Sequence, residues 1–300
     1  MSGGHYEASS RFATRHSLRQ IRPAICAIGR AMTFPAQIYE RRTRHDRRRV
    51  DPHPITHDLA EALVADEIDL MFQPQFASDS QALVGAEALV RWRHPNHGVL
   101  AGDALVGIAQ SGGMARRLAR HIARSALREA ASWPPVLRLS LNVTAMDLAD
   151  RSFAEEMLAL VAQSGFPADR LTLEITEQAL VADLERSAKR LATLAEAGIR
   201  IALDDFGAGF CNFRYLKTLP IDALKLDRSM IEGVAQDKRD LAILRGILAM
   251  ADALGLTVIA EGVETDDQRL IAAREGCAVW QGFLGAEPMA ASDFTLFAAR

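Results

Sequence analysis

Acidic side chains interrupt short apolar runs at five places between residues 87 and 261: Glu87, Glu174, Asp204, Asp205 and Glu261. A carboxylate is seldom buried without a partner, because moving an unpaired one out of water costs several kcal/mol. Asn142, in the run LSLNVTA, offers a neutral oxygen at a similar position. If these side chains converge in the fold, they predict a site that holds cations.

The kind of ligand indicates the kind of ion. Carboxylate and amide oxygens suit hard ions such as Mg²⁺ or Mn²⁺, whereas zinc and iron favour histidine or cysteine. The three cysteines have no CxxC spacing, and five of the eight histidines fall within the first 57 residues: His5, His16, His45, His53 and His57. We therefore expect Mg²⁺ or Mn²⁺ at this site. Two such ions about 3.5–4 Å apart would form the clamp that is used for phosphodiester hydrolysis.

Asp204 and Asp205 are adjacent at a strand end, so their side chains leave in different directions. One carboxylate would then bridge two ions while the other reaches only the second. The alternative is a helix cap or a solvated turn, where Asp before Gly is common. Gly207 and Gly209, in the FGAGF segment that follows, favour an active-site loop instead.

Each remaining candidate also has a plain structural alternative. Glu87 could pair with Arg91 or Arg93, and Glu174 could form a buried ion pair. Asn142 could be a hydrogen-bonded turn residue. Lys225, in the run LKLDR, could be a surface lysine whose stem packs on apolar neighbours.

From about residue 58 the chain alternates helix-like and strand-like segments, and several of the helical ones end in glycine. The predicted helices are 114–133, 153–165, 184–198, 240–255 and 266–276, and the predicted strands are 136–143, 171–176, 200–206, 223–229, 257–263 and 278–283. Strands separated by helices pair in parallel. About eight strands in about 240 residues predict an α/β fold, a (β/α)₈ barrel, whose active site lies at the carboxyl ends of the strands. The acids fall at those ends.

Seven runs match one family in residue and in order: AEALVRW (86–92), LNVTA (141–145), LEITE (173–177), ALDDFGAGF (202–210), LKLDR (224–228), AEGVET (260–265) and QGF (281–283). Over residues 58–296 the chain resembles the EAL-domain family of cyclic di-GMP phosphodiesterases, which is named for the tripeptide that stands here as Glu87-Ala88-Leu89. The resemblance implies a modified TIM barrel in which the first strand is antiparallel to the others.

The same resemblance implies a role for each site residue. One metal ion would be held by Glu87, Asn142, Glu174 and Asp204. The second ion and its hydroxide would be surrounded by Asp204, Asp205 and Glu261, with Lys225 against the attacking water. The nucleotide would be bound by Gln73, Leu89, Arg91 and Gln281. Behind these, the loops would be held by Glu177, Asp227 and Glu264.

The chain departs from the family pattern at several positions. Ala208 and Phe210 replace Thr and Tyr in the loop after the paired aspartates, and Thr144 to Asp147 replace a segment that usually carries Arg. Gly285-Ala286-Glu287 stands where the family usually has Phe-Gly-Arg. These changes remove cations near the nucleotide, so we expect them to alter affinity more than catalysis.

The resemblance implies that the protein hydrolyses cyclic di-GMP to linear pGpG, which lowers the level of a bacterial second messenger, and that it forms a homodimer. The alternative is a catalytically weak or silent cyclic di-GMP receptor that acts through a partner protein. Degenerate members of such families lose metal ligands, whereas this chain keeps every one together with Lys225. The enzyme is therefore the favoured interpretation.

Residues 1–57 carry eleven Arg, no Lys and four acids, a formal +7, so residues 58–300 carry −10 of the whole-chain −3. We interpret them as a basic, disordered tail that contacts a polyanion or an anionic membrane. The alternatives are a solvated tail without a partner, or translation from Met32. No apolar run approaches the roughly 20 residues that span a bilayer, and no export signal is evident. We expect a cytoplasmic protein.

Overall fold

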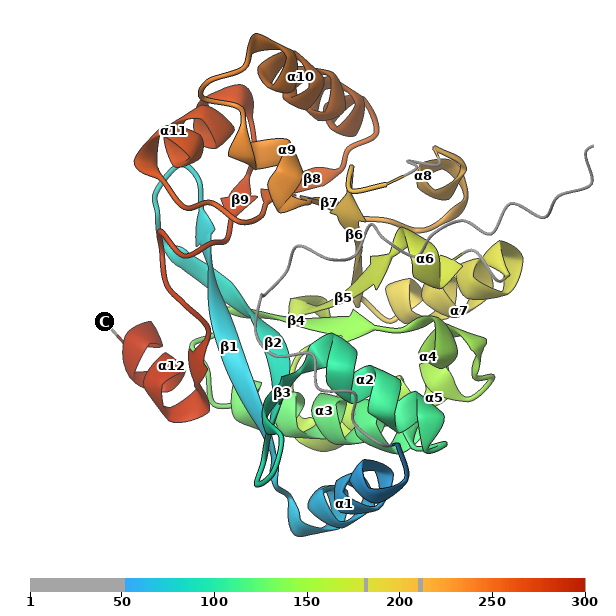
Figure 1. The fold of residues 1–300 in the computed structure, drawn as a ribbon. Coiled ribbons are helices and arrows are strands. Elements are labelled where there is room, and N and C mark those ends of the chain that lie inside the picture. Colours follow the sequence, from blue (N-terminus) through green and yellow to red (C-terminus); the bar gives the residue numbers. More distant parts are fainter. Residues whose placement is uncertain (1–51, 181–182, 210–212, 300) are drawn as a thin grey trace, which may run out of the picture. The chain divides into compact units, whose positions relative to one another are not determined.

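Helices and strands alternate in the computed structural model, which describes residues 52–180, 183–209 and 213–299 (Figure 1). The strands in chain order are β1 (Ile68–Ala77), β2 (Leu83–His94), β3 (Gly98–Ala101), β4 (Arg138–Val143), β5 (Leu171–Thr176), β6 (Arg200–Phe206), β7 (Ala223–Leu226), β8 (Thr257–Ala260), β9 (Val279–Trp280) and β10 (Met289–Ala290). The tail interpreted as disordered lies outside the described residues up to position 51.

The sheet closes on itself. Strand order runs β1-β2-β4-β5-β6-β7-β8-β9 and returns to β1, while β3 and β10 extend it at the edges. Neighbours from β2 to β9 pair in parallel within this ring, whereas β1 is antiparallel to both β2 and β9. The predicted modified TIM barrel with one antiparallel strand is confirmed.

Helices cover the outside of the barrel. They are α1 (Pro52–Ala65), α2 (Gly102–Ser111), α3 (Ala115–Ala130), α4 (Ala145–Ala149), α5 (Phe153–Ser164), the 3₁₀ turn η1 (Ala168–Arg170), α6 (Glu177–Leu180), α7 (Leu184–Glu196), α8 (Arg214–Thr218), α9 (Arg228–Glu232), α10 (Lys238–Ala253), α11 (Asp266–Glu275) and α12 (Ala291–Ala298). No helix among the described residues is long and apolar enough to cross a membrane.

Glycines end four of the crossover helices, as their sequence positions predict. Gly165, Gly198, Gly255 and Gly276 follow α5, α7, α10 and α11, and all have positive φ. A left-handed residue at this position lets the last helical carbonyls find donors without the steric penalty of a Cβ atom. These turns direct each helix back into the next barrel strand.

Helix α1 begins at Pro52, earlier than the domain start at residue 58 that the sequence suggested. Proline is well tolerated in the first turn of a helix, where its missing N–H leaves no hydrogen bond unmade. The inner side of α1 places Ile55 and Leu59 in a satellite core with Trp92 and Leu105. The folded domain therefore includes residues that we had assigned to the tail.

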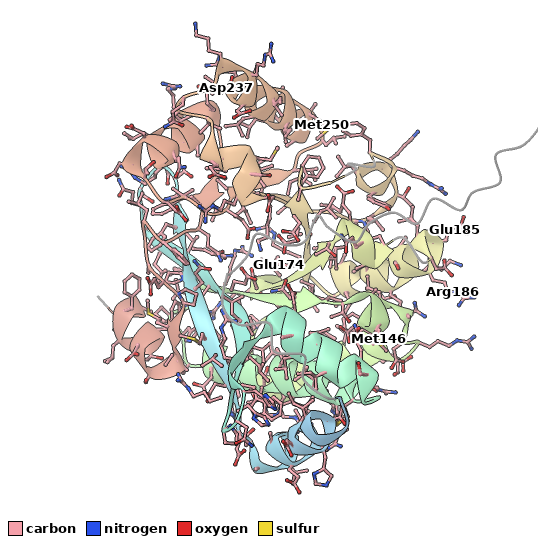
Figure 2. The ribbon with its side chains drawn as sticks, in the orientation of Figure 1. Met146, Glu174, Glu185, Arg186, Asp237 and Met250 are labelled. Carbon is pink, nitrogen blue, oxygen red and sulfur yellow. The ribbon has the colours of Figure 1, made fainter. Side chains whose placement is uncertain are left out.

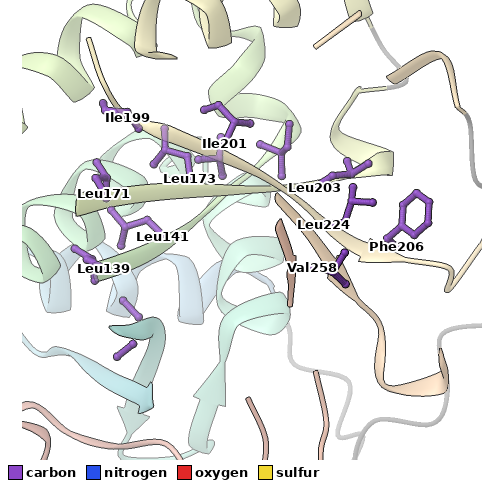
Figure 3. Close-up of a cluster of buried hydrophobic side chains, with 14 of the residues drawn as sticks. Leu139, Leu141, Leu171, Leu173, Ile199, Ile201, Leu203, Phe206, Leu224 and Val258 are labelled. Atoms are coloured by element: carbon purple, nitrogen blue, oxygen red, sulfur yellow. The ribbon is translucent and has the colours of Figure 1, made fainter. Parts of the chain in front are cut away.

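The barrel strands are buried on both faces, with different side chains on each. Leucine and isoleucine point outward beneath the helices, as Figure 3 shows for Leu141, Leu173, Ile201 and Leu224, all at most 2% exposed. The alternate positions point inward and carry the polar residues of the site. Ala202, Ala223 and Ile259 form a small apolar cluster inside the barrel. Each stands two residues before a polar residue of the site and so lies on the same face of its strand.

Candidate active site

Lys225 lies at the centre of the mouth of the barrel and has no exposed surface. Its Nζ atom is 2.5 Å from Glu174 Oε2, 2.7 Å from Glu261 Oε1, 3.3 Å from Asp204 Oδ1 and 3.5 Å from Glu87 Oε2. The four carboxylates come from β2, β5, β6 and the end of β8. Figure 2 labels Glu174 among these strand ends. The sequence-predicted acids thus meet around one buried cation, and Lys225 is not a surface lysine.

Amide side chains hold Glu87 from the other side. Asn142 Nδ2 donates to Glu87 Oε1 at 2.6 Å, and Gln281 Nε2 donates to Glu87 Oε2 at 2.9 Å. Gln281 Nε2 also lies 2.9 Å from Gln73 Oε1, and Gln75 Nε2 donates to Gln281 Oε1 at 3.0 Å. The result is a continuous network from β1 through β2 to the end of β9, which fixes the direction of the Glu87 carboxylate.

Sequence reasoning missed Gln75. Its side chain is buried and supports Gln281, one of the predicted nucleotide ligands. The signal was present, because Gln73 and Gln75 stand two residues apart in a strand and so share one face.

The backbone at the paired aspartates departs from a regular strand. Asp205 has a φ of 54°, and the register between β6 and β7 shifts between Leu203 and Phe206. This local change of backbone turns both side chains toward the mouth, where carboxylate oxygens of Asp204, Asp205 and Glu261 lie within 4.8 Å of one another. Three acids therefore gather at one point, as a second cation site requires.

Burial and charge act on the acids in opposite ways. Burial raises the pKa of Glu174 well above its usual range, against the effect of Lys225, and the neighbouring carboxylates raise it further. Burial likewise raises the pKa of Glu261 to about 8. Burial alone would raise the pKa of Glu87 too, but Lys225 and the hydrogen bonds from Asn142 and Gln281 outweigh it and lower that pKa. The site concentrates more negative charge than one lysine balances.

Two divalent cations would complete the charge balance of this cluster. Glu87, Glu174, Asp204, Asp205 and Glu261 bring five negative charges when ionised, and Lys225 brings one positive charge. Glu174 Oε1 is buried and has no hydrogen-bond partner. A buried oxygen without a partner is costly, and coordination of a hard cation removes that cost. The residues therefore fit a pair of ions of the Mg²⁺ type.

The substitution Glu174→Gln separates the cost of burying this acid from its contribution to metal binding. Burial disfavours the charged form of Glu174 and raises its pKa, so the uncharged amide should cost the metal-free protein little stability. Saturating Mn²⁺ at about a hundredfold excess over Kd should raise the parent's Tm by about 5–10 °C, and we expect the variant to lose most of that gain. Thermal melts in EDTA and in Mn²⁺ measure both. The exposed acid Glu196, changed to Gln, is the matched control; a full Mn²⁺ response in Glu174→Gln would contradict the assignment.

The predicted nucleotide ligands continue outward from the acids along β2. Glu87, Leu89 and Arg91 alternate along this strand and so share a face, and Arg91 Nη1 donates to the Val90 carbonyl at 2.8 Å. Leu89 and Arg91 are both partly exposed. They are thus placed to meet a ligand that enters the mouth above Glu87.

The three residues assigned to loop support lie around the rim. Asp227 caps α9 by accepting a hydrogen bond from the Ser229 N–H at 2.9 Å, and Glu264 forms a two-point ion pair with Arg228. Glu177 begins α6 directly after β5. The Arg228–Glu264 ion pair therefore connects the loops that follow β7 and β8, and Arg228 is a partner that sequence reasoning did not identify.

The altered segment at residues 285–287 has a structural explanation at its first position. A Cβ atom on Gly285 would lie 2.4 Å from the Phe76 ring and 2.9 Å from the Trp280 ring. These two rings stack with their centroids 4.8 Å apart. The aromatic side chain that the family usually carries here is thus replaced by a stacked pair from β1 and β9.

Comparison with known proteins agrees with this geometry. A family model described as the EAL domain matches residues 56–288. The chain belongs to the EAL domain family. All eight barrel strands and every acid of the site fall within the matched range, which begins inside α1.

Relatives of this EAL domain include named enzymes. It is 35% identical over 268 residues to the cyclic di-GMP phosphodiesterase NbdA of Pseudomonas aeruginosa, and the match covers 88% of this chain and 33% of that protein. Among solved structures, the PaMucR phosphodiesterase in complex with c-di-GMP is 32% identical with a TM-score of 0.74, and the match covers 79% of this chain and 98% of that one. The EAL domain of Mycobacterium smegmatis DcpA is 30% identical with a TM-score of 0.65 and covers 77% of this chain and 95% of that one. The chain spans about a third of the length of the curated relatives that it matches.

Proposed function

We propose that this EAL domain hydrolyses cyclic di-GMP to pGpG. The observation that carries the proposal is the convergence of Glu87, Glu174, Asp204 and Glu261 on buried Lys225, with Asp205 beside them. Relatives named cyclic di-GMP phosphodiesterases support the choice of substrate.

The products define the bonds that change. The oxygen of a water molecule attacks one phosphorus atom, the bond from that phosphorus to the ribose 3′ oxygen breaks, and the 3′ oxygen takes up a proton. The linear product carries one 5′ phosphate. Two Mg²⁺ or Mn²⁺ ions, held by the five carboxylates and Asn142, would activate the water and stabilise the attacking and leaving oxygens.

The side chains of this protein divide the remaining work. Lys225 stays protonated because the surrounding acids raise its pKa well above the usual range, although burial alone would lower it. Its ammonium group is therefore a fixed positive charge for the phosphoryl oxygens as negative charge develops on them. Glu261, 2.7 Å from Lys225 Nζ, holds that ammonium group in place. Arg91 and Gln281 bind and orient the nucleotide.

A catalytically silent receptor is the competing function, and the choice of metal ion separates the two. Ca²⁺ accepts the same oxygen ligands as Mg²⁺ but with longer bonds and looser geometry, so it supports binding without efficient hydrolysis. We expect the purified chain to bind cyclic di-GMP in Ca²⁺ and to convert it to pGpG in Mg²⁺ or Mn²⁺. Tight binding in all three ions with no product in any of them would establish the receptor instead.

We further propose that the predicted homodimer forms through an apolar surface beside the DFGAGF loop. A cavity of about 360 Å³ lies there between β6, α9 and α10, lined by Phe206, Met230, Ile247 and Met250 among others. Phe213 and Ile243, which also line it, are 64% and 51% exposed. Apolar side chains grouped on a surface favour association. Sedimentation equilibrium tests this, and a mass near that of one 32.8 kDa chain would contradict it.

The basic tail is proposed to add affinity for a polyanion without contributing to catalysis. A truncation that begins at Val50 keeps all of α1 and removes the eleven tail arginines. We expect it to retain full turnover and to bind duplex DNA or anionic vesicles more weakly, because it loses the tail's arginine–phosphate contacts, which weaken steeply with salt. Equal polyanion binding with and without the tail, or loss of turnover on truncation, would contradict this proposal. A cytoplasmic location remains a prediction.

A further inference from the structure

Helix α3 carries a row of arginines on its outer face. Arg117, Arg120, Arg124 and Arg128 are spaced i, i+3, i+7 and i+11, which places them on one side of the helix over about 16 Å. All four are exposed. The opposite side packs against the barrel through Leu118, Ala126 and Ala130. The row is therefore a fixed feature of the folded domain, independent of the tail.

Three arginines of this row have no acidic partner among the described residues. Arg128 lies within 4.0 Å of Asp66 and Glu129, but Arg117, Arg120 and Arg124 form no ion pair or hydrogen bond with a described side chain. Arginines elsewhere on the surface are mostly paired, as Arg186, Arg245, Arg269 and Arg274 are. Three unbalanced charges on one helix stand out on a domain whose net charge is −10 between residues 58 and 300.

The helices that flank the row expose only uncharged residues beyond their first turns, while Asp103 and Glu155 are exposed in those first turns. α3 packs against α2 and against α5, and beyond the first turns of those helices the exposed residues are Gly107, Gln110, Ser111, Ala159, Ala162 and Gln163. α3 therefore has a neighbouring helix on either side, whereas a helix that reads DNA enters the major groove. None of the exposed residues on the three helices is aromatic, so nothing is present for bases to stack upon. A planar array of phosphates fits this surface better than a nucleic acid does.

We propose that the α3 arginine row, defined as Arg117, Arg120 and Arg124, docks the domain on an anionic phospholipid surface. Each guanidinium offers a planar pair of donors that matches a headgroup phosphate. The acidic remainder of the domain is repelled by the same surface, so the domain binds in one orientation. α3 forms part of the side wall of the barrel, and the mouth that holds Lys225 stays open to solutes in that orientation.

The test uses the full chain and vesicles of phosphatidylcholine with or without phosphatidylglycerol. The triple variant R117Q/R120Q/R124Q should bind the anionic vesicles about a hundredfold more weakly, since each arginine near such a surface contributes about fivefold to partitioning. The matched control K189Q/K217Q/R239Q removes the same charge from three exposed cations on α7, α8 and α10. It should bind within about threefold of the parent. Circular dichroism and turnover of cyclic di-GMP confirm that both variants fold.

Each remaining outcome would overturn the proposal. Equal losses in the two variants would mean that net charge, not the row, determines binding. An unchanged triple variant would mean that the tail or another surface binds the vesicles. If duplex DNA displaced the parent from vesicles at equal phosphate concentration, and the triple variant lost DNA binding, the row would be a nucleic-acid site.

Discussion

Glu87→Gln and Asp204→Asn should each lower the rate of cyclic di-GMP hydrolysis on the order of a thousandfold or more. Both changes keep the size of the side chain but remove a charge that the proposed metal ions require, and a bound metal supplies several kcal/mol of transition-state stabilisation. Glu87 also keeps its amide neighbours Asn142 and Gln281 in place. The measurement is turnover at saturating Mg²⁺, with Tm recorded for each variant.

An exposed acid outside the mouth provides the control. Glu185 lies on α7 and is exposed, so Glu185→Gln should retain the parent's turnover. Near-native activity in either Glu87→Gln or Asp204→Asn at saturating Mg²⁺ would show that these carboxylates are not metal ligands. The charge of the cluster would then need a different explanation.

Lys225→Met should lower kcat by about 10²–10³-fold with little change in nucleotide affinity. The Nζ atom contacts four carboxylates and Lys225 is fully buried, so we expect it to lie below a bound nucleotide and to act on the reacting phosphate. Removing a buried cation from among acids also destabilises the metal-free protein, by about 3–5 kcal/mol, and divalent ions should recover part of this loss.

Binding and turnover of the Lys225 variant need separate measurements. Affinity for cyclic di-GMP is measured in Ca²⁺, where hydrolysis is slow, and kcat is measured in Mn²⁺. A change confined to kcat indicates a charge that acts in the transition state. Comparable losses in affinity and in kcat would indicate that Lys225 anchors the substrate instead.

The sequence was sufficient to predict the barrel because segments with the helical period of 3.6 residues alternate with segments of the strand period of 2 residues along most of the chain. Strand β5, for example, has Leu171, Leu173 and Ile175 on one face and Glu174 on the other, and the structure places the first set under the helices and Glu174 at the mouth. Parallel strands then bring their carboxyl ends to one edge. That rule is enough to gather Glu87, Asn142 and Glu174 without knowledge of any contact.

Other features depended on geometry that periodicity does not contain. The positive φ of Asp205 turns its side chain toward Asp204, whereas a regular strand turns it away. The family resemblance placed Lys225 against the attacking water, but it did not show that the ammonium group contacts four acids. Short elements such as α4 and β10 were also missed, because a few residues are too short to show a period.

The most direct measurement is a reaction of the purified chain with cyclic di-GMP and Mn²⁺ in water enriched in oxygen-18. The products are separated by chromatography, and their masses are measured by mass spectrometry. The account predicts pGpG as the product, with one oxygen-18 atom on its 5′ phosphate, and no product from Asp204→Asn. Recovery of unchanged cyclic di-GMP after prolonged incubation, in a preparation that binds the nucleotide, would contradict the account.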